Sequence, residues 1–363
     1  MKIKEVTNYL ESIAPLSLQE SYDNCGLLTG NHDWKVTSVL VTLDCTEDVV
    51  QEAIEKGANL IVAHHPIIFS GLKKLNGYNH IEKTIITAIK NDIAIYAWHT
   101  NLDHVKNGVN AKICDRLLLS NRKILRPLQN LMKLVTFVPE ENTNEVLDAM
   151  YKVGAGNIGE YEGCSFSIEG KGTFTPKAGA KPFVGSSGNQ EEVIENRLEV
   201  IFPAHRESSI LNALKNAHPY EEVAYYLHPL NNVHQDEGAG MIGELEAEMD
   251  LIDFLAYLKE KMVLNVVKYT PIQGRGIKKV AVCGGSGKFL LKDAIQHGAD
   301  VFVTSDFKYH EFFEGEKRVV IADIGHYESE IYTKELISDF LNKKFTTFAV
   351  DLSETITNPI SYF

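Results

Sequence analysis

Four short stretches of the sequence carry histidine and carboxylate side chains of the kinds that bind metal ions. They are HHP at 64–66, AWHTNLDH at 97–104, TSDFKYHE at 304–311 and GHYESE at 325–330. The candidate ligands and polar neighbours in them are His64, His65, His99, Asp103, His104, Asp306, His310, His326 and Glu330. Imidazoles and carboxylates without a thiolate suit zinc, iron or manganese, and the residue types alone do not choose among these metals.

Each stretch directly follows an apolar run that predicts a buried strand. A lone histidine at a strand end is more often a hydrogen-bonded core or loop residue than a ligand. Asp103 could simply cap a turn, and Glu330 could lie on a solvated helix face. The occurrence of four such clusters, each after a strand, nevertheless favours one shared site.

The adjacent histidines favour a site with two metal ions. Neighbouring strand residues point to opposite sides, so His64 and His65 are poorly placed to bind the same ion. They can bind one ion each if the backbone turns after them. Two ions roughly 3.5–4 Å apart form a familiar hydrolytic arrangement when a carboxylate bridges them. If a helix begins near His326, Glu330 shares one face with it and Glu328 points away.

Two similar strand–helix–strand segments, at 38–69 and 278–307, must position these clusters. Aligned without gaps, they match Val41 with Val282, Ala53 with Ala294, Gly57 with Gly298 and Val62 with Val303. The same alignment places residues 64–65 opposite residues 305–306. Ligands of open α/β sheets gather beyond the carboxyl ends of the strands. We therefore expect an α/β core domain built from two units whose strand ends face one cleft.

The sequence between the two segments has a different pattern. From 128 to 230, strand and helix patterns alternate in the order β-α-β-β-α-β, which predicts an inserted ferredoxin-like α+β domain. The core domain is then discontinuous and consists of 1–127 and 231–363. Three domains in series are the alternative, but each strand–helix–strand unit would then have too small a sheet to bury.

Two further segments, at 283–288 and 21–30, are rich in glycine or turn residues. CGGSGK at 283–288 lies between a strand and a helix, where it could form either an anion-binding nest or a plain tight turn. Its spacing is not that of a Walker A loop. SYDNCGLLTG at 21–30 is rich in turn residues and is interpreted as structural. The sequence also lacks a GxSxG nucleophile elbow.

Composition restricts the classes of partner and compartment. The chain has 363 residues and a formal net charge of −13, which argues against general binding to nucleic acid or anionic membranes. No apolar run is long enough to span a membrane, and the N-terminus does not resemble a secretory signal. The five cysteines are scattered, odd in number and without a CxxC pair. This pattern is typical of reduced thiols and not of a disulfide framework or a cysteine zinc site. We expect a soluble cytoplasmic protein.

Five motifs, in this order, closely resemble the Nif-three-like dinuclear metal family, whose members are often labelled GTP cyclohydrolase I type 2 homologues. They are SYDNCGLLTG, GANLIVAHHPIIF, HTNLDHVKNGVN, TSDFKYHE and IGHYESE. The insert, with GAGNIGEYEGCSFSIEGKGTF and HPYEEVAYYLHPL, is similar to that of the long bacterial form. The resemblance covers essentially the whole chain. One departure is Tyr22, where the family often has Trp, and it concerns packing.

The resemblance implies a pair of divalent metal ions. The implied ligands are His64, His65, Asp103, His326 and Glu330, with Glu330 as the bridge. One ion would take His65 and Asp103, and the other His64 and His326. His99, Asp306 and His310 would be supporting or substrate-facing residues. The resemblance also implies a homohexamer with the sites inside a toroid and a PII-like or CutA-like insert capping it.

The leading functional hypothesis is metal-assisted hydrolysis of a small nucleotide or pterin-type molecule. His310 or His99 would transfer protons, and the family label suggests a cyclohydrolase-like opening of a purine ring. The alternative is a non-catalytic metal- or nucleotide-responsive regulatory or scaffold assembly, which the PII-like insert favours. A metal storage or delivery protein is a third hypothesis. The sequence leaves open whether the protein is an enzyme at all.

Overall fold

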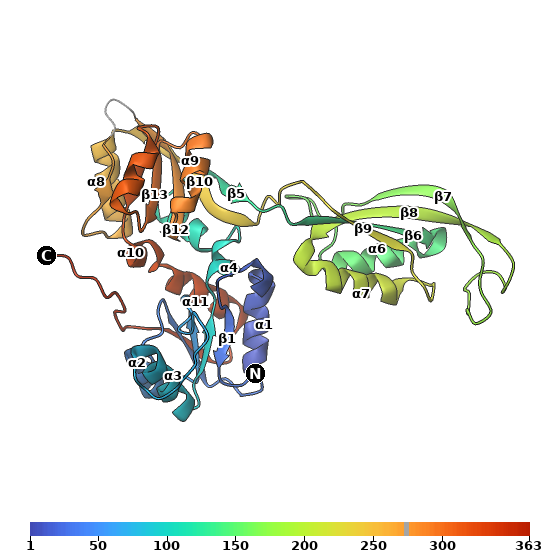
Figure 1. Cartoon of the computed structure of the whole chain (residues 1–363), viewed down its shortest axis with the longest axis horizontal. Coiled ribbons are helices and arrows are strands. Elements are labelled where there is room, and N and C mark those ends of the chain that lie inside the picture. Colours follow the sequence, from blue (N-terminus) through green and yellow to red (C-terminus); the bar gives the residue numbers. More distant parts are fainter. Residues whose placement is uncertain (272–275) are drawn as a thin grey trace. The chain divides into compact units, whose positions relative to one another are not determined.

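The two strand–helix–strand segments lie in two separate sheets of one unit of the chain. The computed structural model describes residues 1–271 and 276–363. It divides into a first unit, Met1–Arg126 with Asp236–Phe363, and a second unit, Pro127–Gln235 (Figure 1). The expected insert, 128–230, begins one residue later and ends five residues earlier than this second unit.

The first sheet has the strand order β1-β4-β3-β2-β15, with parallel neighbours except at β1. Its strands are β1 (Gly26–Thr29), β2 (Ser38–Thr42), β3 (Leu60–Ala63), β4 (Ala94–Ala97) and β15 (Ala349–Leu352), and the helices of this half are α1 (Ile3–Ile13), α2 (Glu47–Lys56), α3 (His80–Lys90) and α11 (Thr333–Lys344). Apolar side chains of β2, β3 and β4 pack against α2 and α3. The Thr46 side chain caps the start of α2, and Gly57 ends it at a left-handed φ of 68°.

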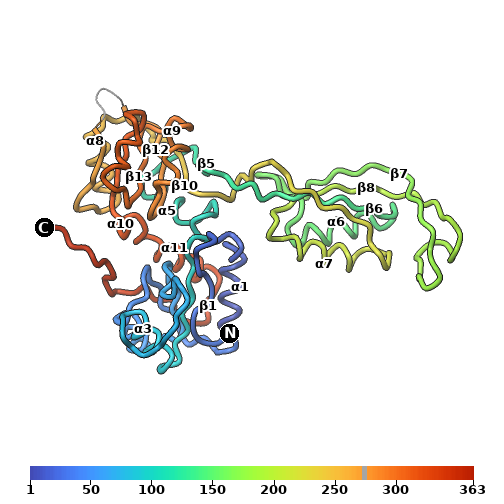
Figure 2. Tube along the Cα trace, viewed as in Figure 1, coloured from blue at the N-terminus to red at the C-terminus, as the bar shows by residue number. Residues whose placement is uncertain are grey.

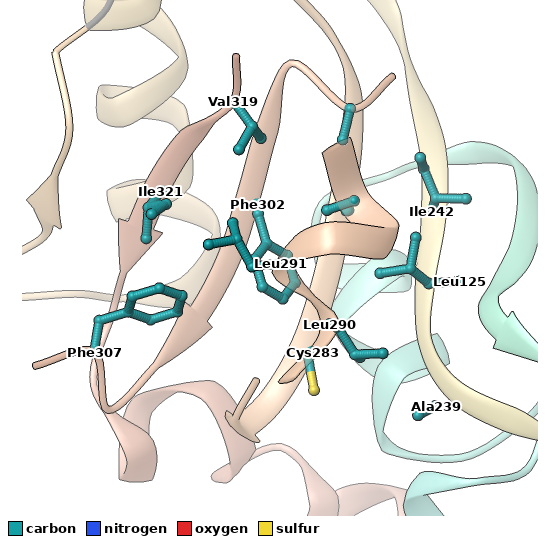
Figure 3. Close-up of a cluster of buried hydrophobic side chains, with 13 residues drawn as sticks. Leu125, Ala239, Ile242, Cys283, Leu290, Leu291, Phe302, Phe307, Val319 and Ile321 are labelled. Carbon is teal, nitrogen blue, oxygen red and sulfur yellow. The ribbon is translucent and has the colours of Figure 1, made fainter. Parts of the chain in front are cut away.

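The second sheet has the order β11-β14-β13-β12-β10-β5. Its strands are β5 (Ser120–Pro127), β10 (Gly238–Met249), β11 (Lys268–Tyr269), β12 (Ile277–Ser286), β13 (Val301–Ser305) and β14 (Val320–Asp323), and the helices of this half are α5 (Val109–Arg116), α8 (Leu251–Met262), α9 (Leu291–Gln296) and α10 (His326–Glu330). β12, β13 and β14 are parallel neighbours. Figure 3 shows the apolar cluster in which Leu291 of α9 packs with Phe302 of β13 and Ile321 of β14.

The internal repeat is reproduced in the strand register of the two sheets. Val41 is the parallel partner of Val62 in the first sheet. Val282 is the parallel partner of Val303 in the second sheet. These are the residues that the gapless alignment matches, so the repeat reflects two equivalent strand–helix–strand units. The prediction of a two-unit α/β core is confirmed.

The second unit has the predicted β-α-β-β-α-β order. Its elements are β6 (Leu131–Pro139), α6 (Thr143–Lys152), β7 (Phe166–Phe174), β8 (Glu191–Pro203), α7 (Glu207–Ala217) and β9 (Tyr225–Pro229) (Figure 2). The sheet order is β7-β8-β6-β9 with antiparallel neighbours, which is the ferredoxin-like topology. Buried apolar residues of β6 and β8, among them Leu134 and Leu198, pack against Val146 of α6 and Ile210 of α7.

Glu52 on α2 anchors the segment that follows β15. Its carboxylate accepts hydrogen bonds from Ser353 Oγ at 2.6 Å, the Glu354 N–H at 2.8 Å and Thr355 Oγ1 at 2.7 Å. Lys56 Nζ lies 2.8 Å from the same carboxylate. Burial alone would raise the pKa of Glu52, but the hydrogen bonds from Lys56, Ser353 and the neighbouring groups lower it from 4.5 to about 2.

Neutralising Glu52 is therefore expected to destabilise the folded protein above pH 4.5. Because the folded state holds Glu52 as an anion, its contribution is complete above the ordinary pKa and is lost as the pH falls towards 2. Glu52→Gln should lower the free energy of unfolding by on the order of 2 kcal/mol at pH 7, and its difference from wild type should shrink between pH 4.5 and pH 2. Urea titrations at several pH values measure this.

Glu55→Gln is the matched control, because Glu55 lies on the same helix and is exposed. The Glu55 carboxylate accepts a hydrogen bond from Gln51 Nε2 on the same helix at 3.1 Å. A Glu52→Gln protein as stable as the control at pH 7 would contradict the anchoring role.

Candidate metal centre

The candidate ligands lie where the chain leaves the carboxyl ends of strands in both sheets. His64 and His65 follow β3, His99 follows β4, and Asp103 ends the single-turn helix α4 (Thr100–Asp103). His326 and Glu330 are the first and last residues of α10, which follows β14. These ends face a cavity of about 500 Å³ in the first unit. Its lining includes His65, His99, Asp103, His104, His326 and Glu330.

Glu330 lies between imidazoles from the two sheets. Its side chain is 3% exposed. One carboxylate oxygen, Oε2, is 3.0 Å from His65 Nε2 and 3.0 Å from His326 Nε2. The other, Oε1, is 3.9 Å from His64 Nε2. This buried carboxylate therefore joins histidines that come from both halves of the fold.

His64 and Asp103 provide a direct test of whether a cation fits. His64 Nε2 and Asp103 Oδ1 are 3.7 Å apart. Both atoms are buried and have no hydrogen-bond partner within the described part of the chain. An unsatisfied buried polar group costs about 1–3 kcal/mol, and a cation bound between a ring nitrogen and a carboxylate oxygen satisfies both. The residues fit a metal site.

The Nδ1 atom of each histidine is held by an oxygen atom of the protein. The partners are Trp98 O at 2.9 Å for His64, Asp44 Oδ1 at 2.7 Å for His65, Asp23 Oδ1 at 2.8 Å for His99 and Asp306 Oδ2 at 2.6 Å for His326. A carbonyl oxygen can only accept, so His64 Nδ1 donates, and in a neutral ring Nε2 keeps its lone pair. Such contacts fix the orientation of metal-binding histidines and raise their basicity.

Among the residues that the structure describes, two groups of side chains have ligand atoms close enough to hold a metal ion. One is His64, His65 and His99, and the other is His65, His326 and Glu330, each with its ligand atoms within 4.8 Å of one another. The distances group the residues differently from the expected division, which paired His65 with Asp103 and His64 with His326. The bond to Trp98 turns His64 towards Asp103, whereas the bond to Asp44 turns His65 towards α10.

The same contacts determine the protonation of the metal-free site. Burial would lower the pKa of His65, but hydrogen bonds to Asp44 and Glu330 raise it to about 10. In His326, burial is outweighed by hydrogen bonds to Asp306 and Glu330, which raise the pKa to about 11. Burial would raise the pKa of Glu330, but the neighbouring imidazoles hold it well below its usual value. Burial, reinforced by the Glu330 carboxylate, raises the pKa of Asp103 to about 7.

The remaining predicted residues occupy different positions. His99 lines the cavity, and Asp306 holds His326. His104 also lines the cavity, with Nδ1 3.0 Å from Leu18 O. His310 is exposed on the 3₁₀ segment Tyr309–Gly315 and is not among the described residues that line the cavity.

Two carboxylates of the site were not predicted from the sequence. Asp44 directly follows the buried strand β2, and the strand-end signal that identified the histidines applies to it equally. Asp23 lies in SYDNCGLLTG, the segment interpreted as structural. It bonds the ring of His99 at 2.8 Å and accepts the Thr100 N–H at 3.1 Å. Burial would raise the pKa of Asp23, but the hydrogen bonds from the His99 ring and the Thr100 hydroxyl lower it.

Residues 283–286 of the CGGSGK segment form the end of β12, where the register against β13 shifts and makes room for Glu330. The Gly284 N–H donates to Asn110 Oδ1 at 3.0 Å, and the Gly285 N–H donates to Ser329 Oγ at 2.9 Å. These donors are engaged inside the protein, which argues against an anion nest, and the segment is an irregular strand end in place of the tight turn that the sequence also allowed. Gly285 has a φ of 61°, and a Cβ atom there would collide with Glu330 Oε1.

The family model Duf34/NIF3 (NGG1p interacting factor 3) matches residues 1–359. The chain belongs to this family. It is 39% identical to the GTP cyclohydrolase 1 type 2 homolog of Bacillus subtilis over 366 residues, which cover 99% of this chain and 98% of that protein. It is 37% identical to the Staphylococcus epidermidis protein of the same name over 369 residues, which cover 100% of both chains. The resemblance inferred from the motifs is confirmed.

Two solved structures of similar proteins share the fold. A Bacillus cereus protein related to NIF3 has a TM-score of 0.87 at 37% identity, covering 100% of this chain and 99% of that one. The Staphylococcus aureus protein SA1388 has a TM-score of 0.79 at 34% identity, with the same coverage. In the described part of this DUF34/NIF3 protein, no helix has both the length and the apolar character needed to cross a membrane.

Gly285→Ala is expected to reduce metal binding by displacing Glu330. Gly298→Ala is the matched control, because Gly298 has a similar φ of 69° and no atom within 4 Å of the added Cβ. The backbone penalty of roughly 1 kcal/mol is then shared. Elemental analysis should give less metal per chain in Gly285→Ala than in wild type and in the control. Equal metal content in the two variants would show that Glu330 tolerates the displacement.

Metal uptake at pH 7 is expected to release protons from the site. His65 and His326 hold protons below pKa values of about 10 and 11, and a metal-binding imidazole must lose its proton. Binding at the His65–His326–Glu330 group should therefore release about two protons at pH 7, and metal affinity should fall as the pH falls. Calorimetric titration in two buffers of different ionisation enthalpy measures the release. Uptake without proton release would contradict the assigned protonation.

Proposed function

We propose that this DUF34/NIF3 protein is a metal-dependent hydrolase with two divalent ions in the cavity of its first unit and a small nucleotide or pterin-type substrate. The observation that carries the proposal is the buried Glu330 carboxylate between His65 and His326, with the unpartnered His64 Nε2 and Asp103 Oδ1 beside it. Glu330 would join a His65–His326 ion to a His64–Asp103 ion. Bound divalent ions supply Lewis acidity and activate water for attack near neutral pH.

The chain's own side chains orient the ligands and handle protons. Asp44, Asp306 and Trp98 O hold the rings of His65, His326 and His64. We assign proton transfer to His99, because it lines the cavity and Asp23 holds its Nδ1. An imidazole oriented by a carboxylate is a common general acid or base. His310 is exposed outside the cavity lining and is left out of this assignment.

Aromatic side chains at the cavity support a planar ring as the substrate. Tyr22, Phe69, Phe289 and Tyr327 are among the lining residues. Tyr22 is 62% exposed and Phe69 is 49% exposed, and their ring centroids are 6.1 Å apart. Exposed aromatic rings beside a polar site offer stacking surfaces for a heterocycle. The cavity volume of about 500 Å³ is in the usual range for small-molecule sites.

The second candidate function is a non-catalytic metal- or nucleotide-responsive assembly, such as a homohexamer. A separate cavity of about 740 Å³ in the second unit favours it, because its lining includes Phe137, Phe174, Phe183 and Tyr220. An aromatic cavity remote in sequence from the metal ligands suits an effector. Deletion of the insert would then abolish effector binding while the metal content of the first unit survives.

His99→Gln and His310→Gln together test the hydrolase. With zinc, manganese or iron supplied separately, wild type is expected to hydrolyse a purine nucleotide such as GTP, or a pterin, only when metal is bound. His99→Gln should lower kcat by about 10²–10⁴-fold and keep the wild-type metal content. His310→Gln should keep wild-type kcat. Metal-loaded wild type without turnover of any nucleotide or pterin would favour the regulatory assembly, and an equal loss in both variants would refute the assignment to His99.

A further inference from the structure

The segment that follows β15 is fixed to both halves of the metal centre. Its first residues, 353–355, are held by Glu52 on the first half, as described above. Further on, Thr357 Oγ1 donates to Asp44 Oδ2 at 2.6 Å, and Asn358 Nδ2 donates to Glu328 Oε1 at 3.1 Å. Residues 353–360, here called the C-terminal strap, therefore connect the end of β2 with α10. The label C in Figures 1 and 2 marks Phe363, three residues beyond this strap.

The contact made by Thr357 reaches a metal ligand through one carboxylate. Asp44 Oδ1 is 2.7 Å from His65 Nδ1, and Asp44 Oδ2 accepts from Thr357. The two oxygens of this carboxylate thus serve two different partners. Because the carboxylate is planar, the hydroxyl of Thr357 restricts its rotation and with it the direction of the His65 ring. His65 Nε2, which lies 3.0 Å from Glu330 Oε2, depends on that direction.

The strap also forms part of the cavity wall. Asn358, Pro359 and Ile360 are among the residues that line the cavity. Asn358 is held to Glu328, which lies on α10 between His326 and Glu330. The strap therefore supplies one part of the cavity wall, beside α10.

We propose that Thr357 is a positioning residue for the metal ligand His65, acting through Asp44, and that residues 357–360 of the C-terminal strap complete the metal centre. The inference rests on the metal site of the proposed function and deepens it, because it assigns the retention of one ion to the end of the chain. Asp44 without its second partner can rotate, and His65 then holds its ion less firmly. Second-sphere substitutions of this kind weaken metal binding by about 10–100-fold.

Thr357→Val and Thr355→Val form a matched pair that tests the role of Thr357. Both threonines lie half-buried in the strap, and each donates its hydroxyl to a carboxylate outside it. Thr357 donates to Asp44 at 2.6 Å, and Thr355 donates to Glu52 at 2.7 Å. Each variant removes one of these hydroxyls. The zinc-loaded full chain is mixed with an excess of a coloured chelator, and the release of each ion is followed with time. Thr357→Val should release one of two ions about tenfold faster than wild type, with the other ion unchanged. Thr355→Val should release both ions at wild-type rates.

Three further arms keep the outcome decisive. Thr357→Ser retains the hydroxyl and should restore wild-type release. In an Asp44→Asn background, Thr357→Val should add no further effect, because the two residues act in series. Thermal unfolding of the zinc-free variants measures the structural loss, which should be similar for Thr357→Val and Thr355→Val. Equal release rates from these two variants, or equal acceleration of both ions, would overturn the positioning role.

The assay separates this inference from the proposed function. Zinc release requires no substrate. Wild type that binds two ions without turnover would therefore contradict the hydrolase proposal and leave the role of Thr357 unaffected. Turnover by wild type together with unaltered zinc release from Thr357→Val would support the hydrolase and contradict the role of Thr357. Wild type that binds no zinc, manganese or iron would overturn the metal centre and both proposals with it.

Discussion

The candidate metal centre depends on one buried carboxylate, whose negative charge is compensated by groups from both halves of the fold. Glu330 is 3% exposed, and an ionised carboxyl group removed from water is stable only with charge partners or metal ions. Its partners arrive from β3 and from α10 itself, so the two halves of the fold cannot separate without exposing an uncompensated charge. The glycine at position 285, near the end of β12, follows from the same constraint, since a Cβ atom there would collide with the Glu330 carboxylate.

Each imidazole beside Glu330 also contacts an oxygen atom of the protein through its Nδ1 atom. Asp44, Asp306 and Asp23 each hold one Nδ1 atom, and the carbonyl of Trp98 holds another. The imidazole rings thus lie between two sets of oxygen atoms. Glu330 is at the centre of the site, and the three aspartates and the Trp98 carbonyl are on the outer side of the rings. This order explains why His65 and His326 hold protons so strongly when no metal is bound.

Much of the fold follows from the sequence because periodicity and repeats are local signals. The match of Val41 and Val62 with Val282 and Val303 identified the equivalent strands, and the β-α-β-β-α-β pattern identified the insert. The grouping of ligands could not be derived in this way, because it depends on ring rotation, which Trp98 O and Asp44 determine from distant positions. The strap at 353–360 has no periodic pattern, and its role appears only from its hydrogen bonds to Glu52, Asp44 and Glu328.

The order of the ligands along the chain has a consequence for biosynthesis. Glu330 lies 265 residues after His65, and Thr357 lies 313 residues after Asp44. A growing polypeptide emerges from the ribosome with its N-terminal part first. The His64–His65 pair is therefore translated long before its carboxylate partner exists, while the insert, with its own apolar core, can fold during that interval. The cluster of histidines and carboxylates is therefore complete only after Glu330 has been translated, and a product that ends before residue 330 lacks the carboxylate that joins the two sheets.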